Sequence, residues 1–192
     1  MPNNYVINDN DQPVYVEMTN TFQSPDISAP PEISASESAV LFTANASNSA
    51  TIVLGLSSAI ISVRINNPAG SGKTLYLSRI SGSIGGTSLL TSISGTFTLV
   101  RGGTVSSPAT VTPVNNNLAS PAASAMTVQS STAVISGGSI LATYQLAPGV
   151  FTPIFTGSII VPPGAAVSAN VTSSSAAVGT IISALSLTWW ER

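Results

Sequence analysis

The sequence predicts an all-β fold: an antiparallel β-sandwich of the jelly-roll type with an extended N-terminal arm. Apolar and polar residues alternate in short runs through most of the chain, and glycine and proline turns separate these runs. Acidic residues crowd into the first 37 of the 192 positions, which marks the arm. We therefore divide the chain into an acidic connector arm with a proline-rich hinge, residues 1–38, and a jelly-roll domain, residues 39–192.

The arm contains two short alternating pieces, Tyr5–Ile7 and Val14–Met18, followed by a link that holds Pro25, Pro30 and Pro31. Prolines at this density predict an extended and fairly stiff link. A strand-forming tail on such a link can add to the open edge of a neighbouring sheet. The alternatives are an arm that folds back on its own body and a disordered leader. The expected anchors of a subunit interface are the apolar arm residues Tyr5, Ile7, Val14, Val16 and Met18.

In the body, period-two alternation predicts eight to ten strands and no helix. The clearest run is Ala59–Ile65, in which Ile61, Val63 and Ile65 alternate with polar residues. The predicted strands are, in order, Val40–Thr43, Thr51–Leu56, Ala59–Ile65, Thr74–Ile80, Ile93–Val100, Thr127–Ser130, Ile140–Leu146, Phe151–Val161, Ala165–Val171 and Thr180–Trp190. Turn signals such as Pro148-Gly149 separate them.

Charge is sorted along the chain. Six of the seven acidic residues lie in the arm and four of the five basic residues lie in the body, which gives the arm a charge of −6 and the body +4. Opposite charges attract, so we expect the arm of one copy to lie on the body of the next. The residues expected to be charge-complementary are Asp9, Asp11 and Glu17 on the arm and Arg64, Lys73, Arg79 and Arg101 on the body.

The composition argues against an enzyme and against a cofactor. Without cysteine or histidine there is no thiolate nucleophile, no Ser-His-Asp triad and no metal site built from these residues. The body between Ser38 and Trp190 also has no carboxylate for acid/base catalysis. Charged residues make up 6% of the chain, against roughly a quarter in typical domains, which favours association of copies.

One segment, Asn67–Thr74, ends in Gly-Lys-Thr as a phosphate-binding loop does. That pattern needs a glycine where Asn67 stands, and it needs a helix after Lys73, where the residues alternate as a strand. We therefore predict a hairpin loop at this position instead of a nucleotide site.

Nucleic acid and membrane are not expected partners. Four cations spread over the body do not form a dense basic face, and no run of 18 apolar residues is present. Residues 1–10 also lack the basic start and apolar run of a secretory signal. Trp189 and Trp190 point to opposite faces of a strand, so we expect Trp190 to reach the surface and contact a neighbouring subunit or, in a carbohydrate-binding adhesin, a sugar.

The arm, the proline-rich hinge and the charge-poor jelly roll rich in serine, threonine and alanine resemble the subunits of bacterial endospore appendage fibres. More loosely, they resemble fibre proteins of bacteriophages, and the closing segment Leu185–Arg192 resembles the final strand of such phage proteins. The better known appendage subunits carry cysteines in the arm. This chain has none, so its fibre would be held by strand pairing, burial and charge complementarity.

The resemblance implies a structural subunit of a fibre outside the cell, on a spore or cell surface. Its partners would be other copies of itself, in a polymer or a trimer, together with an anchoring or tip protein. A virion fibre or decoration protein and a carbohydrate-binding adhesin are the alternatives, and an ice-binding role ranks last because the threonines follow no fixed period.

Overall fold

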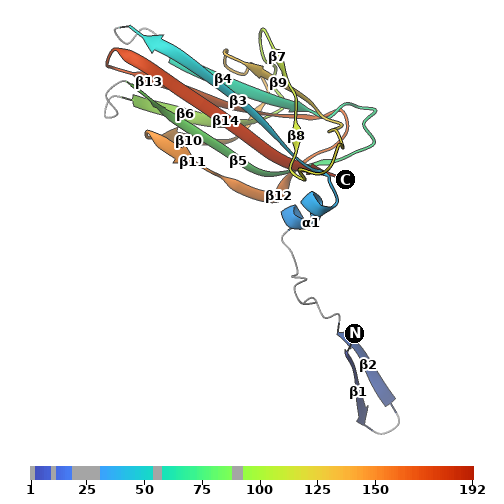
Figure 1. The fold of residues 1–192 in the computed structure, drawn as a ribbon. Coiled ribbons are helices and arrows are strands. Elements are labelled where there is room, and N and C mark those ends of the chain that lie inside the picture. Colours follow the sequence, from blue (N-terminus) through green and yellow to red (C-terminus); the bar gives the residue numbers. More distant parts are fainter. Residues whose placement is uncertain (1–2, 10–11, 19–30, 54–57, 88–92) are drawn as a thin grey trace.

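The computed structural model describes residues 3–9, 12–18, 31–53, 58–87 and 93–192, the first two stretches as backbone only. Two antiparallel sheets pack face to face in the body (Figure 1). The predicted β-sandwich is therefore confirmed. Pro25 and Pro30 of the predicted link, and Leu56 at the end of a predicted strand, lie outside the described residues.

Each sheet of the body contains six strands. The first sheet consists of β4 (Ser58–Asn66), β6 (Ile93–Arg101), β7 (Ala109–Val111), β9 (Thr127–Ser131), β10 (Ser139–Leu146) and β13 (Ala166–Ser175), in the spatial order β10-β6-β13-β4-β9-β7. The second consists of β3 (Leu41–Ile52), β5 (Leu75–Gly86), β8 (Val114–Asn115), β11 (Gly149–Phe151), β12 (Ile154–Val161) and β14 (Gly179–Glu191), in the order β11-β5-β14-β3-β8, with β12 also paired to β5.

The strand pairing is that of a jelly roll. Among the eight main strands, the first pairs with the last (β3 with β14) and the second with the seventh (β4 with β13). The third pairs with the sixth (β5 with β12) and the fourth with the fifth (β6 with β10). This nested order is a long hairpin wrapped into a sandwich, and it places β10 and β12 at the same side of the two sheets.

The core lies between the sheets. Inward positions of the long strands carry large apolar side chains with almost no exposure, such as Val63 in β4, Phe97 in β6 and Trp189 in β14. The rings of Phe42 and Trp189 lie 6.3 Å apart between their centroids. Full burial of such side chains stabilises the fold by about 1.5–3 kcal/mol each.

Several strand limits differ from prediction. The predicted strand Val40–Thr43 and the start of the predicted strand Thr51–Leu56 belong to one strand, β3, which ends at Ile52; its inward positions include small residues such as Ala44 that hide the alternation. The predicted strand Thr74–Ile80 continues through glycine to Gly86. At Gly82 a Cβ atom would lie 2.7 Å from the carbonyl oxygen of Ala184, so only glycine lets the two strands approach.

The predicted strand Phe151–Val161 is divided into β11 and β12 around Pro153. Proline has no N–H to donate to the neighbouring strand. Its carbonyl oxygen still accepts a hydrogen bond of 3.1 Å from the backbone N–H of Ile80. Farther along, β12 has a bulge with positive φ at Thr156 and Gly157. The very short β7 and β8 were not predicted, because two or three residues show no alternation.

The prediction of a hairpin loop at Asn67–Thr74 is wrong. The loop joins β4 to β5, and these strands belong to different sheets, so it is a corner of the sandwich. A strand and not a helix does follow Lys73, which agrees with the rejection of a phosphate-binding loop.

A short helix, α1 (Pro31–Glu37), was also not predicted. It replaces the expected extended conformation at Pro31, because proline is well suited to the first turn of a helix. The helix lies on the body through the buried Ala35 and a 3.0 Å hydrogen bond from the Ser78 hydroxyl to the Glu32 carboxylate. Seven residues are too few for a 3.6-residue pattern to be recognised.

The helix ends in a Schellman motif with Ala39 in the left-handed conformation, at φ 56°. The N–H of Val40 donates to the carbonyl oxygen of Ala35 (2.9 Å), and the N–H of Ala39 donates to the carbonyl oxygen of Ser36 (3.0 Å).

We expect Ala39→Gly to raise the free energy of unfolding by about 0.5–1 kcal/mol, because glycine adopts this conformation without steric cost. Urea denaturation measures the effect. Ser36→Gly inside the helix is the matched control, expected to destabilise by about 0.5–1 kcal/mol. Equal effects of the two substitutions would contradict the cap.

Candidate functional site

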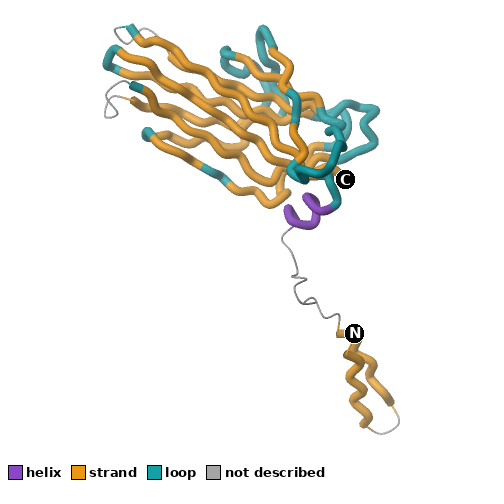
Figure 2. The backbone as a smooth tube through the Cα atoms, viewed as in Figure 1, coloured by secondary structure: helices purple, strands orange, loops and turns teal. Residues whose placement is uncertain are grey.

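The predicted interface arm is a β-hairpin. Strands β1 (Asn3–Asp9) and β2 (Gln12–Met18) pair with each other in an antiparallel two-stranded sheet (Figure 2). Tyr5 is opposite Val16, and Ile7 is opposite Val14. Directly paired positions and every second position share a face of a sheet. The register therefore places all five predicted anchor positions on one face: Tyr5, Ile7, Val14, Val16 and Met18.

The arm acids occupy different places on this hairpin. Asp9 is the last residue of β1 and belongs to the face of the anchor positions, while Glu17 lies in β2 opposite Asn4, on the other face. Asp11 lies outside the described residues. One acid of the predicted arm is used within the chain, since Glu32 is bonded to Ser78.

The four body cations are distributed over both sheets. Arg64 in β4 is partly buried, and its Nε donates a 3.0 Å hydrogen bond to the Gly103 carbonyl. Lys73 is exposed in the loop between β4 and β5. Arg79 in β5 is exposed opposite Ile154, and Arg101 at the end of β6 is exposed opposite Ser139. Two of the four, Arg79 and Arg101, therefore stand beside the edge strands β12 and β10.

Trp189 and Trp190 point to opposite faces of β14, as predicted. Trp189 is fully buried in the core, whereas Trp190 is partly exposed on the outer face of its sheet. The Trp190 ring stacks on Tyr76 with 5.6 Å between centroids and 7° between planes. Its Cη2 lies 2.2 Å from the position that a Cβ on Gly157 would take. One face of Trp190 is thus already used within its own chain.

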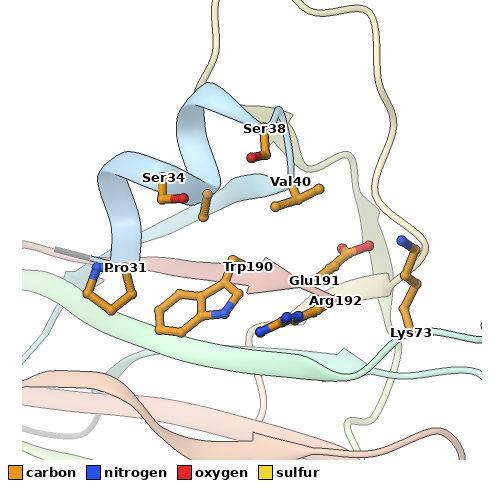
Figure 3. Close-up of a pocket in the computed structure, with 9 residues that line it drawn as sticks. Pro31, Ser34, Ser38, Val40, Lys73, Trp190, Glu191 and Arg192 are labelled. Carbon is orange, nitrogen blue, oxygen red and sulfur yellow. The ribbon is translucent and has the colours of Figure 1, made fainter. Parts of the chain in front are cut away.

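A cavity of about 510 Å³ lies between α1 and the end of β14. Figure 3 shows α1 on one side of it and the Trp190 ring on the other, with Lys73 and Arg192 nearby. Its lining residues are Pro31, Ser34, Ala35, Ser38, Val40, Lys73, Trp190, Glu191 and Arg192. The lining mixes cationic, hydroxyl and apolar groups and holds no nucleophile paired with a base.

Glu191 is the one acidic side chain of this lining, and it is buried. Its Oε1 accepts hydrogen bonds from the Ser124 hydroxyl and from the indole N–H of Trp189 (3.0 Å). Its Oε2 accepts from the backbone N–H of Ala125 (2.9 Å). Both oxygens are therefore engaged in joining β14 to the segment before β9, which gives Glu191 a structural role.

A group of exposed apolar residues on the edge strands β10, β11 and β12 was not predicted from the sequence. These are Ile140, Leu141, Tyr144, Val150, Ile154 and Ile160. The available signal was two apolar neighbours in a row, as in Ile140-Leu141 and Ile159-Ile160, where a half-buried strand should alternate. Such pairs place apolar side chains on both faces of a strand.

Among the described residues, no three histidine, cysteine, aspartate or glutamate side chains lie close enough to share a metal ion. In the same part of the chain, no helix has the length and apolar character to cross a membrane. The sequence matches no protein-family model and no curated protein.

Proposed function

We propose that the protein is a structural subunit that assembles into an extracellular fibre by docking its N-terminal arm onto a neighbouring copy. The observation that carries the proposal is the hairpin formed by β1 and β2. Its register gathers five apolar anchor positions on one face. The arm carries six acids, and the body supplies four cations. An acidic element with an apolar face complements a charge-poor body with exposed apolar strands.

Apolar contact would supply most of the affinity. A standard protein interface buries about 1,200–2,000 Å², and two seven-residue strands are long enough to contribute a large share of one side. Exposed ion pairs contribute only about 0–1 kcal/mol each. Their role would be to guide encounter and fix the register of the arm.

We expect a chain that lacks residues 1–20 to fold and to remain monomeric. All strands of the two body sheets and their core lie between Leu41 and Glu191, so the deletion removes none of them. Negative-stain microscopy and sedimentation velocity measure assembly. A thermal melt followed by circular dichroism checks the fold of the truncated protein.

The matched control is full-length Asp9→Asn/Glu17→Gln, which keeps the apolar anchors and removes two charges. It should assemble more slowly than the unmodified chain but reach the same product, because charge governs encounter more than stability. Filaments formed by the truncated chain would refute the docking arm, as would an unmodified chain that stays monomeric.

The same microscopy separates the fibre from its alternatives. Closed trimers would favour a virion fibre or decoration protein. Monomers that bind glycans, with binding lost in Trp190→Ala, would favour an adhesin. The stacking of Trp190 on Tyr76 weighs against the adhesin, because it occupies one of the two ring faces that a sugar could use.

A further inference from the structure

Exposed apolar side chains concentrate on one lateral side of the sandwich. Six of the thirteen large exposed hydrophobic residues of the described chain belong to β10, β11 and β12, the group named above. Ile140 is 69% exposed and Val150 is 87% exposed. We call these six residues, together with the groove that lies between β10 and β12, the β10–β12 edge. Exposed apolar side chains gathered on the strands of one border make that border a candidate interaction site.

Backbone groups are also open on this side. Of the described strands, β10 pairs only with β6, and both β11 and β12 pair only with β5. Their outer backbone groups therefore have no partner strand, which makes each of them a template for an added strand. In Figure 1, β10, β11 and β12 lie together along one border of the sandwich.

A groove of about 330 Å³ lies between the two sheets on this side. Leu141 of β10 and Ile160 of β12 line it from different sheets, and Arg101 contributes a cation. Toward the C-terminal end of β10, aromatic rings cover the core. The centroid of the Phe97 ring lies 5.7 Å from that of Tyr144, on which it stacks, and 5.2 Å from that of Phe151. The open part of the edge thus combines apolar side chains with a positive charge.

This combination matches the N-terminal hairpin. The hairpin strands have seven residues each, close to the eight of β10 and of β12. The anchor face holds the five apolar positions together with Asn3, Asp9 and Gln12. Arg101 lines the groove, and Arg79 lies opposite the start of β12. The body has no carboxylate from residue 39 to residue 190 that could pair with these cations.

We propose that the β10–β12 edge is the docking surface for the N-terminal hairpin of a second copy, an inference that rests on the proposed function and locates its site. The anchor face of the hairpin covers Leu141 and Ile160, and an arm carboxylate pairs with Arg101. When one copy docks its arm on a second copy, its own edge stays free for the arm of a third. The contact is therefore head-to-tail and can repeat along a fibre.

The test uses full-length Leu141→Glu/Ile160→Glu, which places one charge on each of the two strands that line the groove. These side chains are 49% and 56% exposed, so the fold should tolerate the change. The matched control is Val178→Glu/Ile182→Glu, at 62% and 48% exposure and outside the edge. By sedimentation velocity we expect the edge variant to be monomeric and the control to assemble as the unmodified chain does.

Mixing two variants tests whether docking occurs between copies. The chain without residues 1–20 has an edge but no arm, and the edge variant has an arm but no usable edge. Together they should form a 1:1 dimer and no longer species. Adding Arg101→Ala to the truncated chain should weaken that dimer by about fivefold at most, because an exposed ion pair contributes only about 0–1 kcal/mol.

The outcomes separate this inference from the proposed function. If the truncated chain is monomeric but the edge variant still assembles, the arm docks elsewhere and the β10–β12 edge is excluded. If the truncated chain assembles through its edges, two bodies pair directly and both proposals fail. A mixture that stays monomeric would place the arm on its own body and overturn docking between copies.

Discussion

Glu191→Ala is expected to lower the free energy of unfolding by about 2–5 kcal/mol, because a buried hydrogen-bond donor without a partner costs about 1–3 kcal/mol. The carboxylate accepts hydrogen bonds from the Ser124 hydroxyl, the Ala125 backbone N–H and the Trp189 indole. The hydroxyl can rotate to another acceptor. The fully buried Trp189 cannot reach water, and the N–H of Ala125 is held by the chain.

Urea denaturation followed by tryptophan fluorescence measures this loss. Glu191→Gln is the matched control, with an expected cost of about 1–3 kcal/mol, because its NH₂ group must face one of the donors whichever way the amide is oriented. In a double-mutant cycle with Trp189→Phe, which removes the indole donor, the two substitutions should couple by about 0.5–3 kcal/mol. A loss under about 1 kcal/mol in Glu191→Ala would mean that these hydrogen bonds contribute no net stability.

The sandwich could be predicted from sequence because most strands are buried on one face and solvated on the other. Val63 and Phe97 stand at inward positions of runs that alternate clearly, and both are buried as expected. Prediction failed where alternation is hidden or interrupted. Ala44 is inward but small, Pro153 interrupts a run that remains attached to β5, and α1 is too short for a helical period.

Sheet membership could not be predicted from local pattern. The turn residues of Asn67–Thr74 suit a hairpin, yet the jelly-roll order sends the chain from β4 to a strand of the other sheet. The same order brings β10 and β12 together, although they pair with different strands. An apolar edge formed by two sheets depends on such long-range pairing, so the sequence could indicate its residues but not their convergence.

Charge sorting has a local consequence in the fold. Small polar side chains perform much of the bonding on the outer face of the first sheet, where the Ser168 hydroxyl donates to the Gly102 carbonyl (2.6 Å) and Asn170 donates to Ser62 (3.1 Å). No buried side-chain nitrogen or oxygen of the described residues lacks a partner. The exposed cations Arg79 and Arg101 have no carboxylate in residues 39–190 with which to pair, which fits the proposed docking of an acidic arm.

Asn67→Ala is expected to destabilise the fold by about 2–4 kcal/mol, because it removes a fully buried amide and takes its donor from the carbonyl of Val161 in a buried hydrogen bond. The Asn67 Nδ2 donates to the carbonyl oxygens of Lys73 (2.8 Å) and Val161 (2.9 Å). Its Oδ1 accepts from the Ser71 hydroxyl (2.5 Å). The side chain therefore ties the loop between β4 and β5 to the end of β12.

Asn67, the residue that departs from the phosphate-loop pattern, thus stabilises the loop between β4 and β5. Ser71→Ala is the matched control, since it removes the partly buried hydrogen bond to Asn67 and two exposed hydrogen bonds with the Lys73 backbone and should cost about 0.5–1.5 kcal/mol. Urea denaturation measures both variants, and limited proteolysis between Pro68 and Lys73 should detect a loosened loop only in Asn67→Ala. Equal stability losses in the two variants would contradict the role of the Val161 contact, because Ser71→Ala leaves that hydrogen bond intact.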